Sequence, residues 1–164
     1  MFDTRMAAFG LAAALLLCGH VNGQGVVTQR SPSLAMAKTI AEASVAECKA
    51  KGFSTTAAVV DRAGQVLVIL RDEQATPQTV EMARRKAYTA RMYRMTTNDF
   101  QKRMLNDPKY LAQKDVSDIL ALGGGVPIQI GNDVIGAAGS AGSTQEQDEA
   151  CAKAGIAKVA DLLK

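Results

Sequence analysis

The sequence predicts an α+β domain in which helices pack against a central antiparallel sheet of about five strands, in the order α-β-β-α-(α)-β-β-β-α. Short β-rich runs lie close together, and tight-turn residues at 61–64 and 131–132 join two pairs of them. Longer segments with apolar residues at helical spacing lie between and around these runs. Strands joined by tight turns pair antiparallel, so the helices are expected to cover the sheet.

The N-terminal part of the domain predicts a helix followed by a hairpin. Apolar residues recur at helical spacing over 34–51, and Gly52 follows as a typical residue just past a helix end. Residues 55–60 and 65–70 are rich in β-branched and apolar side chains. We therefore expect two strands there, joined by the turn at 61–64.

A second helix is predicted from 78 to about 95, after the turn-forming pair Thr76-Pro77. One face of this helix carries only small side chains that suit close packing: Ala83, Ala87 and Ala90. A short extra helix is expected at 97–104, with Thr97 or Asn98 as its N-cap. The segment 109–117 is ambiguous.

The C-terminal part predicts three short strands and a final helix. The strands are expected at 119–122, 126–130 and 133–138, with a tight turn between the last two. The last helix is expected at 144–163, and its first turns carry acidic residues, which suit the positive end of a helix dipole.

A glycine-rich run begins within the strand expected at 133–138 and leads into the last helix. Gly136, Gly139 and Gly142 form a G-x-x-G-x-x-G pattern, and glycine loops before a helix can hold anions on backbone N–H groups. The pattern follows a hairpin strand, and no βαβ unit can follow it. It is therefore not a dinucleotide-binding fingerprint.

The N-terminus predicts an exported protein. Arg5 precedes an apolar run at 6–18 that has the length of a signal-peptide core and is too short to cross a bilayer comfortably. We expect a signal peptide at 1–23, a flexible leader at 24–33, and a domain at 34–164. The alternative is an uncleaved anchor. The expected location is the periplasm or the outside, with no membrane span left after cleavage.

Removal of a signal peptide changes which cysteines and histidines remain. Cys18 would be lost, which leaves Cys48 and Cys151 either as one disulfide or as two buried thiols. His20, the one histidine of the chain, would also be lost. Histidine triads, histidine general bases and histidine zinc sites are then excluded from the mature protein.

The charge does not indicate a nucleic-acid-binding protein, because the net charge is only +3 with 21% charged residues. Basic residues are concentrated in the stretch 81–103, which contains seven basic residues and two acidic ones. A solvated helix face is the favoured explanation. The alternative is that one or two of these residues line a site for an anionic ligand.

Motifs along residues 34–164 resemble the GlcG/HbpS family of small haem-binding, sometimes called haem-degrading, proteins. The segments that carry the resemblance are VVDRAGQVLVILRDE, ARRKAYTA and GGGVPIQIGNDVIGAAGSAGSTQEQDEACAKAG. The residues that match in order are Asp61, Gly64, Arg71, Asp72, Lys86, Ala87, Thr89, Ala90, Gly124, Pro127, Gly136, Gly139, Ser140, Gly142 and Asp148.

The resemblance implies a compact α+β domain that often assembles as a homo-octamer. Some members are exported and bind haem or act in redox sensing. A related domain ends the PduO-type corrinoid adenosyltransferases, and other members sit beside glycolate-utilisation enzymes. The family therefore predicts the fold better than the function.

Haem is the cofactor that the resemblance implies, and its iron would need a ligand other than histidine. Tyr88 and Met92 are four residues apart on one helix face, and both residue types can ligate haem iron. Packing in the core or a subunit interface is the favoured explanation of this pair. Glu146 and Glu149 have the spacing of an E-x-x-E iron site, although their place at a helix start already explains them.

A site for a carboxylate-bearing ligand is expected around the family positions. The expected ligand-binding residues are Arg71, Asp72, Lys86, Thr89, Gly139, Ser140, Gly142 and Asp148. Structural roles are the alternative: Asp148 would satisfy loop N–H groups near Gly142, and Lys86 would pair with Asp72.

Two classes of function remain. The first is an exported oligomeric binding protein for haem or a related tetrapyrrole, in haem handling or redox sensing. The second is an accessory protein or enzyme acting on a small organic acid, with Lys86 or Asp148 as acid or base. The missing histidine and the lack of a nucleophile–base pair favour the first class.

Overall fold

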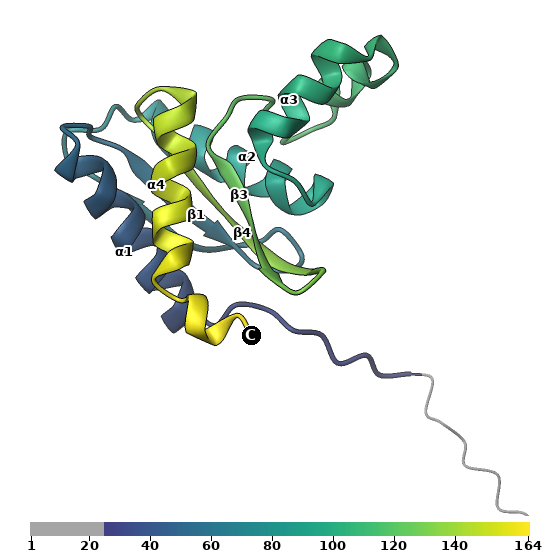
Figure 1. The fold of residues 1–164 in the computed structure, drawn as a ribbon, viewed down its shortest axis with the longest axis horizontal. Coiled ribbons are helices and arrows are strands. Elements are labelled where there is room, and N and C mark those ends of the chain that lie inside the picture. Colours follow the sequence, from purple (N-terminus) through teal and green to yellow (C-terminus); the bar gives the residue numbers. More distant parts are fainter. Residues whose placement is uncertain (1–24) are drawn as a thin grey trace, which may run out of the picture.

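The structure is a computed structural model that describes residues 25–164, so the expected signal peptide with Cys18 and His20 lies outside the described residues. Its centre is an antiparallel sheet with the strand order β2-β1-β4-β3 (Figure 1). The strands are β1 (Thr56–Val60), β2 (Val66–Arg71), β3 (Gly125–Ile130) and β4 (Asp133–Ala141). The β1–β2 and β3–β4 pairs are the two hairpins that the turn residues predict.

Helices surround this sheet, which confirms the α+β class. The α-helices are α1 (Leu34–Ala50), α2 (Gln78–Tyr93), α3 (Thr97–Asn106) and α4 (Gln145–Ala157). Two 3-10 helices, η1 (Pro108–Asp115) and η2 (Ala160–Leu162), follow α3 and α4. The ambiguous segment 109–117 therefore belongs mostly to η1, and the last α-helix ends six residues before the expected position 163.

The strand expected at 119–122 is wrong, and the sheet of the described chain has four strands. Side chains of neighbouring helices take the backbone groups of this segment instead. Thr89 of α2 accepts a hydrogen bond from Leu120 N at 2.9 Å, and Arg85 donates to Ile119 O at 2.6 Å. With its backbone already bonded, the segment has no need of a strand partner.

The two sheet faces pack against different helices. Helices α1 and α4 cover one face, where Ile40, Val59 and Ile128 are fully buried. Helix α2 covers the other face with the small side chains that the sequence predicts, Ala83, Ala87 and Ala90. In Figure 1, α1 and α4 lie side by side in front of the sheet and α2 lies behind it.

Glycine lets α2 approach the sheet closely. A Cβ at Gly139 of β4 would lie only 2.3 Å from Ala83 O, and one at Gly125 of β3 would lie 2.2 Å from Lys86 O. Both distances are far below van der Waals contact. These two glycines of the C-terminal third therefore serve the packing of a helix on a sheet.

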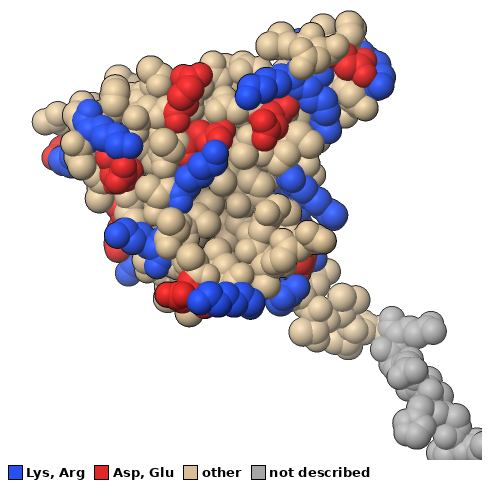
Figure 2. All heavy atoms as spheres, in the orientation of Figure 1, with Lys and Arg blue, Asp and Glu red and all other residues tan. Residues whose placement is uncertain are grey.

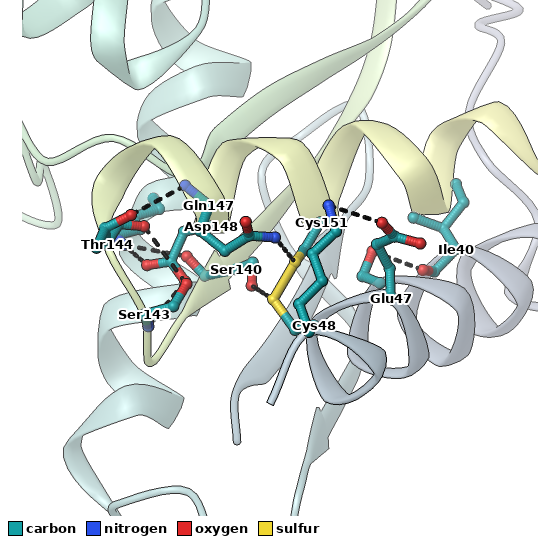
Figure 3. The surroundings of a disulfide bond; sticks show 12 residues. Ile40, Glu47, Cys48, Ser140, Ser143, Thr144, Gln147, Asp148 and Cys151 are labelled. Atoms are coloured by element: carbon teal, nitrogen blue, oxygen red, sulfur yellow. Dashed lines mark hydrogen bonds and ion pairs between the residues drawn. A yellow bond between two sulfur atoms is a disulfide. The ribbon is translucent and has the colours of Figure 1, made fainter. Parts of the chain in front are cut away.

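A disulfide joins the helices on the front face. Cys48 near the end of α1 and Cys151 in the middle of α4 form the bond, with their Cα atoms 5.6 Å apart (Figure 3). Both residues are fully buried. The bond closes a sequence separation of 103 residues. A disulfide typically contributes about 2–4 kcal/mol to stability by restricting the unfolded chain.

Helix α3 begins at the expected residue, Thr97, but its N-cap is neither of the two residues expected from the sequence. Thr96 is the N-cap, and its hydroxyl accepts from Asp99 N at 3.2 Å. Thr97, one of the two expected caps, instead accepts from Gly125 N of β3 at 2.8 Å. This bond ties the start of α3 to the sheet, while the rest of α3 extends away from it (Figure 1).

Candidate functional site

Helix α2 carries charged side chains toward both ends of the sheet, and we name these ends by their turns. The glycine end comprises residues 123–125 before β3 and residues 140–143 after β4. The hairpin end comprises the turns at 61–64 and 131–132. Of the residues expected at a site, only the possible haem ligands Tyr88 and Met92 lie at the hairpin end.

At the glycine end, Lys86 of α2 forms a buried ion pair with Asp148 of α4. Lys86 Nζ lies 2.7 Å from Asp148 Oδ2, and each side chain is only 2% exposed. Lys86 Nζ also donates to Ser140 O at 3.0 Å. Because α2 and α4 cover opposite faces of the sheet, this pair joins the two helix layers past the end of β4. The expected pairing of Lys86 with Asp72 is therefore wrong.

The second oxygen of Asp148 holds the loop before α4. Asp148 Oδ1 accepts from Ser143 N at 3.1 Å and from Ser143 Oγ at 2.6 Å, as the alternative structural role of Asp148 in the sequence analysis expected. Asp148, Ser143 and Ser140 are labelled in Figure 3 beside the disulfide. Both carboxylate oxygens are thus occupied within the protein.

Gly124 gives the ion pair its space. A Cβ at this position would lie 2.8 Å from Asp148 Cβ and 3.0 Å from Lys86 Nζ, and the backbone has a φ of +127°. Burial lowers the pKa of Lys86, and the adjacent Asp148 carboxylate opposes that shift. Lys86 is therefore held as the buried partner of Asp148, with no free face toward solvent.

The remaining expected ligand residues also have protein partners. Thr89 binds the backbone of the segment at 119–122, and Gly139 packs against α2. Gly142 has a φ of +135° and faces Ser54 O, where a Cβ would lie at 2.6 Å. These three residues shape the glycine end through contacts within the protein.

Arg71 and Asp72 form a separate group at the end of β2. The Arg71 guanidinium donates to Ala75 O and, at 3.5 Å, to Glu73 O. Asp72 is buried, accepts from Gln74 N at 3.0 Å and pairs with Lys49 of α1 at 2.9 Å. The hydrogen bond from Lys49 holds the pKa of Asp72 below its usual range. Both residues therefore brace the β2–α2 connection.

The hairpin end places Tyr88 and Met92 together. A Cβ at Gly64 would lie 2.7 Å from Met92 Cε and 2.9 Å from Tyr88 Cδ2, so both side chains lie over the glycine turn. They share one face of α2, as their spacing predicts. Tyr88 is half-buried, and Met92 is 36% exposed. This pair thus has a side open to solvent.

Four arginines gather around this turn. Arg62 in the turn pairs with Asp133 at 2.8 Å, and Arg30 of the leader pairs with the same carboxylate at 3.0 Å. Within residues 25–164, no carboxylate forms an ion pair with Arg91 or Arg94 of α2. Arg91 Nε is buried and makes no hydrogen bond in this part of the chain. The hairpin end thus carries more positive than negative charge.

The arginines influence one another. Burial lowers the pKa of Arg91, and the positive charges of Arg62 and Arg94 lower it further. The hydrogen bond from Arg62 lowers the pKa of Asp133, so that carboxylate stays ionised between its two arginines. In the sequence, Arg91 and Arg94 stand out only as two members of the basic stretch at 81–103. The place of Arg91 one turn after Tyr88 is the signal that could have found it.

The described residues show no other cluster that would hold a metal. Within residues 25–164, no three His, Cys, Asp or Glu residues group together. Glu149 binds Lys153 at 2.5 Å and Asn98 at 2.5 Å, while Glu146 is exposed. Of the two glutamates of the E-x-x-E pattern, Glu149 therefore already has partners within the protein.

Two further features of the described residues are the distribution of surface charge and the character of the helices. Acidic and basic side chains are interspersed on the face drawn in Figure 2. Among residues 25–164, no helix combines the length and the apolar character needed to span a bilayer.

Comparison with known proteins places this geometry in a family. Residues 33–157 match the family model described as "Haem degrading protein HbpS-like". Protein GlcG of Escherichia coli strain K12 is 30% identical over 104 residues, which cover 63% of this chain and 76% of GlcG.

Solved structures share the fold. A double mutant of HbpS from Streptomyces reticuli matches with a TM-score of 0.79 and 32% identity, over 94% of this chain and 99% of that one. The structure described as a PduOC:Heme complex matches with a TM-score of 0.69 over 77% of this chain and 93% of that one. At 24% identity, this second likeness concerns the fold alone.

Proposed function

This chain belongs to the HbpS-like family, and from that premise we propose that it binds haem or a related tetrapyrrole at the hairpin end. The family description names haem, and one structural relative is described as a haem complex. Those names speak of the relatives. The proposal for this chain depends on whether its own residues suit the group.

The Tyr88–Met92 pair is the observation that carries the proposal. A tyrosine oxygen and a methionine sulfur both ligate haem iron in proteins, and residues 25–164 contain no histidine. The pair packs over Gly64, whose missing side chain lets both side chains approach the turn, and Met92 is 36% exposed while Tyr88 is half-buried. Tyr88 and Met92 would hold the iron, and haem would supply a redox-active centre when bound.

The glycine end supports the binding proposal over the organic-acid alternative. An enzyme that used Lys86 or Asp148 as acid or base would have to bring substrate to one of them. Each side chain is 2% exposed, and each is bonded within the protein. A proton transfer to substrate requires contact within hydrogen-bond reach, which this packing does not offer.

We further propose that the protein is exported to the periplasm or outside, where it handles haem or senses redox change. The apolar run at 6–18 has the length of a signal-peptide core. The disulfide between Cys48 and Cys151 supports export, because such bonds persist in oxidising compartments.

We also propose a homo-oligomer, with an octamer as the size that the family resemblance implies. Strand β2 is an edge strand of the sheet, and its large side chains Val66, Ile69 and Leu70 are 43%, 37% and 37% exposed. Exposed apolar edge strands pair with other chains unless they are covered. A second copy that covers β2 would bury them. Light scattering after gel filtration should show that Ile69→Lys lowers the molar mass, and an unchanged mass would contradict this interface.

Hemin titration of the purified protein tests the main proposal. We expect a saturable Soret shift at micromolar hemin in the wild-type protein. Tyr88→Phe and Met92→Leu should change the band or weaken affinity about tenfold, which corresponds to ~1.4 kcal/mol. Tyr110→Phe on η1 is the matched control and should leave the spectrum unchanged. The absence of a saturable shift would refute tetrapyrrole binding.

A further inference from the structure

The hairpin end carries more arginine side chains than carboxylates. Asp133 is already shared by Arg30 and Arg62. The other turn carboxylate, Asp61, uses its Oδ1 to accept from Ala63 N and Gln65 N, both at 2.8 Å. Asp133 is thus paired with two other arginines, and Oδ1 of Asp61 is committed to the turn backbone.

Arg91 and Arg94 are the arginines without a carboxylate partner in residues 25–164. They are three residues apart at the end of α2, so their side chains leave neighbouring points of the helix surface. Arg91 is half-buried, and its Nε has no partner in the described chain. Arg94 is exposed and ends the helix in the left-handed region, with a φ of 55°.

Arg91 adjoins the face that holds Tyr88 and Met92. Arg91 follows Tyr88 by three residues and precedes Met92 directly, so it belongs to the rim of the same face. Arg62 lies in the turn that contains Gly64, against which Tyr88 and Met92 pack. The hairpin end therefore presents an apolar and aromatic patch bordered by cationic groups.

We infer that Arg91 and Arg94 bind a pair of carboxylates, those of the two propionates of the tetrapyrrole. This inference rests on the proposed function and moves the expected carboxylate site away from Arg71 and Lys86, whose side chains have protein partners. A planar guanidinium binds a carboxylate through two parallel hydrogen bonds. Two arginines free of carboxylates match a ligand with two carboxylates.

The charge of the site supports this assignment. Burial and the neighbouring positive charges of Arg62 and Arg94 lower the pKa of Arg91, while the charges of Asp133 and Asp61 oppose that shift. Within residues 25–164, Arg91 forms no ion pair with a carboxylate. A bound carboxylate would supply the missing negative charge. By contrast, Lys86 at the glycine end already has such a partner in Asp148.

Protoporphyrin IX and its dimethyl ester test the inference without iron. Fluorescence titration compares the two porphyrins on wild-type protein, Arg91→Gln, Arg94→Gln and the control Lys158→Gln, which removes an exposed charge on α4. We expect the diacid to bind wild-type protein about tenfold or more tightly than the ester, the range of a charge-assisted hydrogen bond. Arg91→Gln and Arg94→Gln should reduce this preference, and Lys158→Gln should keep it.

A second arm uses glutarate, a small dicarboxylate, and follows the arginine Nε–H signals by NMR. We expect millimolar glutarate to shift the Arg91 signal and to leave that of Arg103 unchanged. If neither porphyrin binds, the proposed function fails, and the glutarate titration decides the carboxylate site by itself. Equal binding of diacid and ester, or an Arg91 signal that glutarate does not move, would overturn the inference.

Discussion

Positive charge is compensated differently at the two ends of the sheet that α2 covers. At the glycine end, Lys86 is buried and its ammonium group is matched by Asp148 and Ser140 O. At the hairpin end, Arg91 and Arg94 have no carboxylate partner in residues 25–164, and Arg94 is exposed. The difference separates charge that completes the fold from charge that remains for a ligand.

The comparison also shows what the family positions do. Lys86, Ser140, Gly142 and Asp148 carry much of the family resemblance, and in the structure they hold two helix layers and a loop together. Shared motif residues therefore mark a shared fold here. The surface that we propose for ligand binding depends on less conspicuous residues, such as Arg91 and Met92.

The largest effect is expected from breaking the ion pair at the glycine end. Lys86→Met leaves the Asp148 carboxylate buried without its counterion, so the free energy of unfolding should fall by about 3–5 kcal/mol. Urea unfolding followed by circular dichroism measures this change. The double variant Lys86→Met with Asp148→Leu should recover part of the loss, because no buried charge remains.

If Lys86→Met unfolds at the same urea concentration as wild type, the pair does not contribute as described. In that case, the Lys86 charge at the glycine end would not stabilise the fold, and the contrast with the hairpin end would be lost. Lys158→Gln, which changes an exposed lysine of α4, serves as the control and should unfold like wild type.

The disulfide should have the next largest effect. Replacement of Cys48 and Cys151 by serine removes a link across a long loop, so stability should fall by about 2–4 kcal/mol. Thermal unfolding with and without reductant measures it. The double variant should be insensitive to reductant. A wild-type protein with two titratable thiols would refute the bond.

Acid should weaken the brace at the end of β2. The hydrogen bond from Lys49 lowers the pKa of Asp72 in the folded protein, so the folded state binds fewer protons there than the unfolded chain does. The stabilisation is present above the ordinary aspartate pKa of about 3.9 and is lost as pH falls through the lower, folded value.

Asp72→Asn should therefore be less stable than wild type at pH 7, and the difference should shrink as pH falls below about 4. Urea midpoints across the range from pH 7 to pH 2 measure this convergence. A constant gap between the two proteins would show that the Asp72 charge has no part in the brace.

The smallest effect on stability is expected at the hairpin end. The Arg91 charge lies among other arginines and carboxylates that it shares with them. Its removal in Arg91→Gln should therefore change the free energy of unfolding by no more than about 0.5 kcal/mol. Urea unfolding checks this. A loss as large as that of Lys86→Met would assign Arg91 to the framework rather than to a ligand site.

Much of the fold was predictable from local patterns. The hairpin turns, the small face of α2 and the cap glycine after α1 all follow from backbone or packing requirements that short stretches of sequence express. The missing strand at 119–122 was not predictable in this way. Its fate depends on Thr89 and Arg85, which are distant in sequence and take its backbone groups.

The site was harder to predict because charge pairing is a property of three-dimensional structure. The sequence analysis grouped Arg71, Lys86 and Asp148 by motif, whereas the fold separates Arg71 from the other two. It did foresee that Tyr88 and Met92 share a helix face. The packing of that face over the turn at Gly64 was not predictable from local pattern, because this contact joins residues 24 positions apart or more.

Paramagnetic broadening by ferric hemin tests the central claim most directly. Amide signals of the protein are recorded before and after addition of hemin, because the iron broadens signals of nearby residues. The account predicts broadening at 61–66 and 88–94, with the signals of 123–125 and 140–148 preserved. Broadening centred on 123–125 and 140–148 would contradict the assignment of the hairpin end as the ligand face.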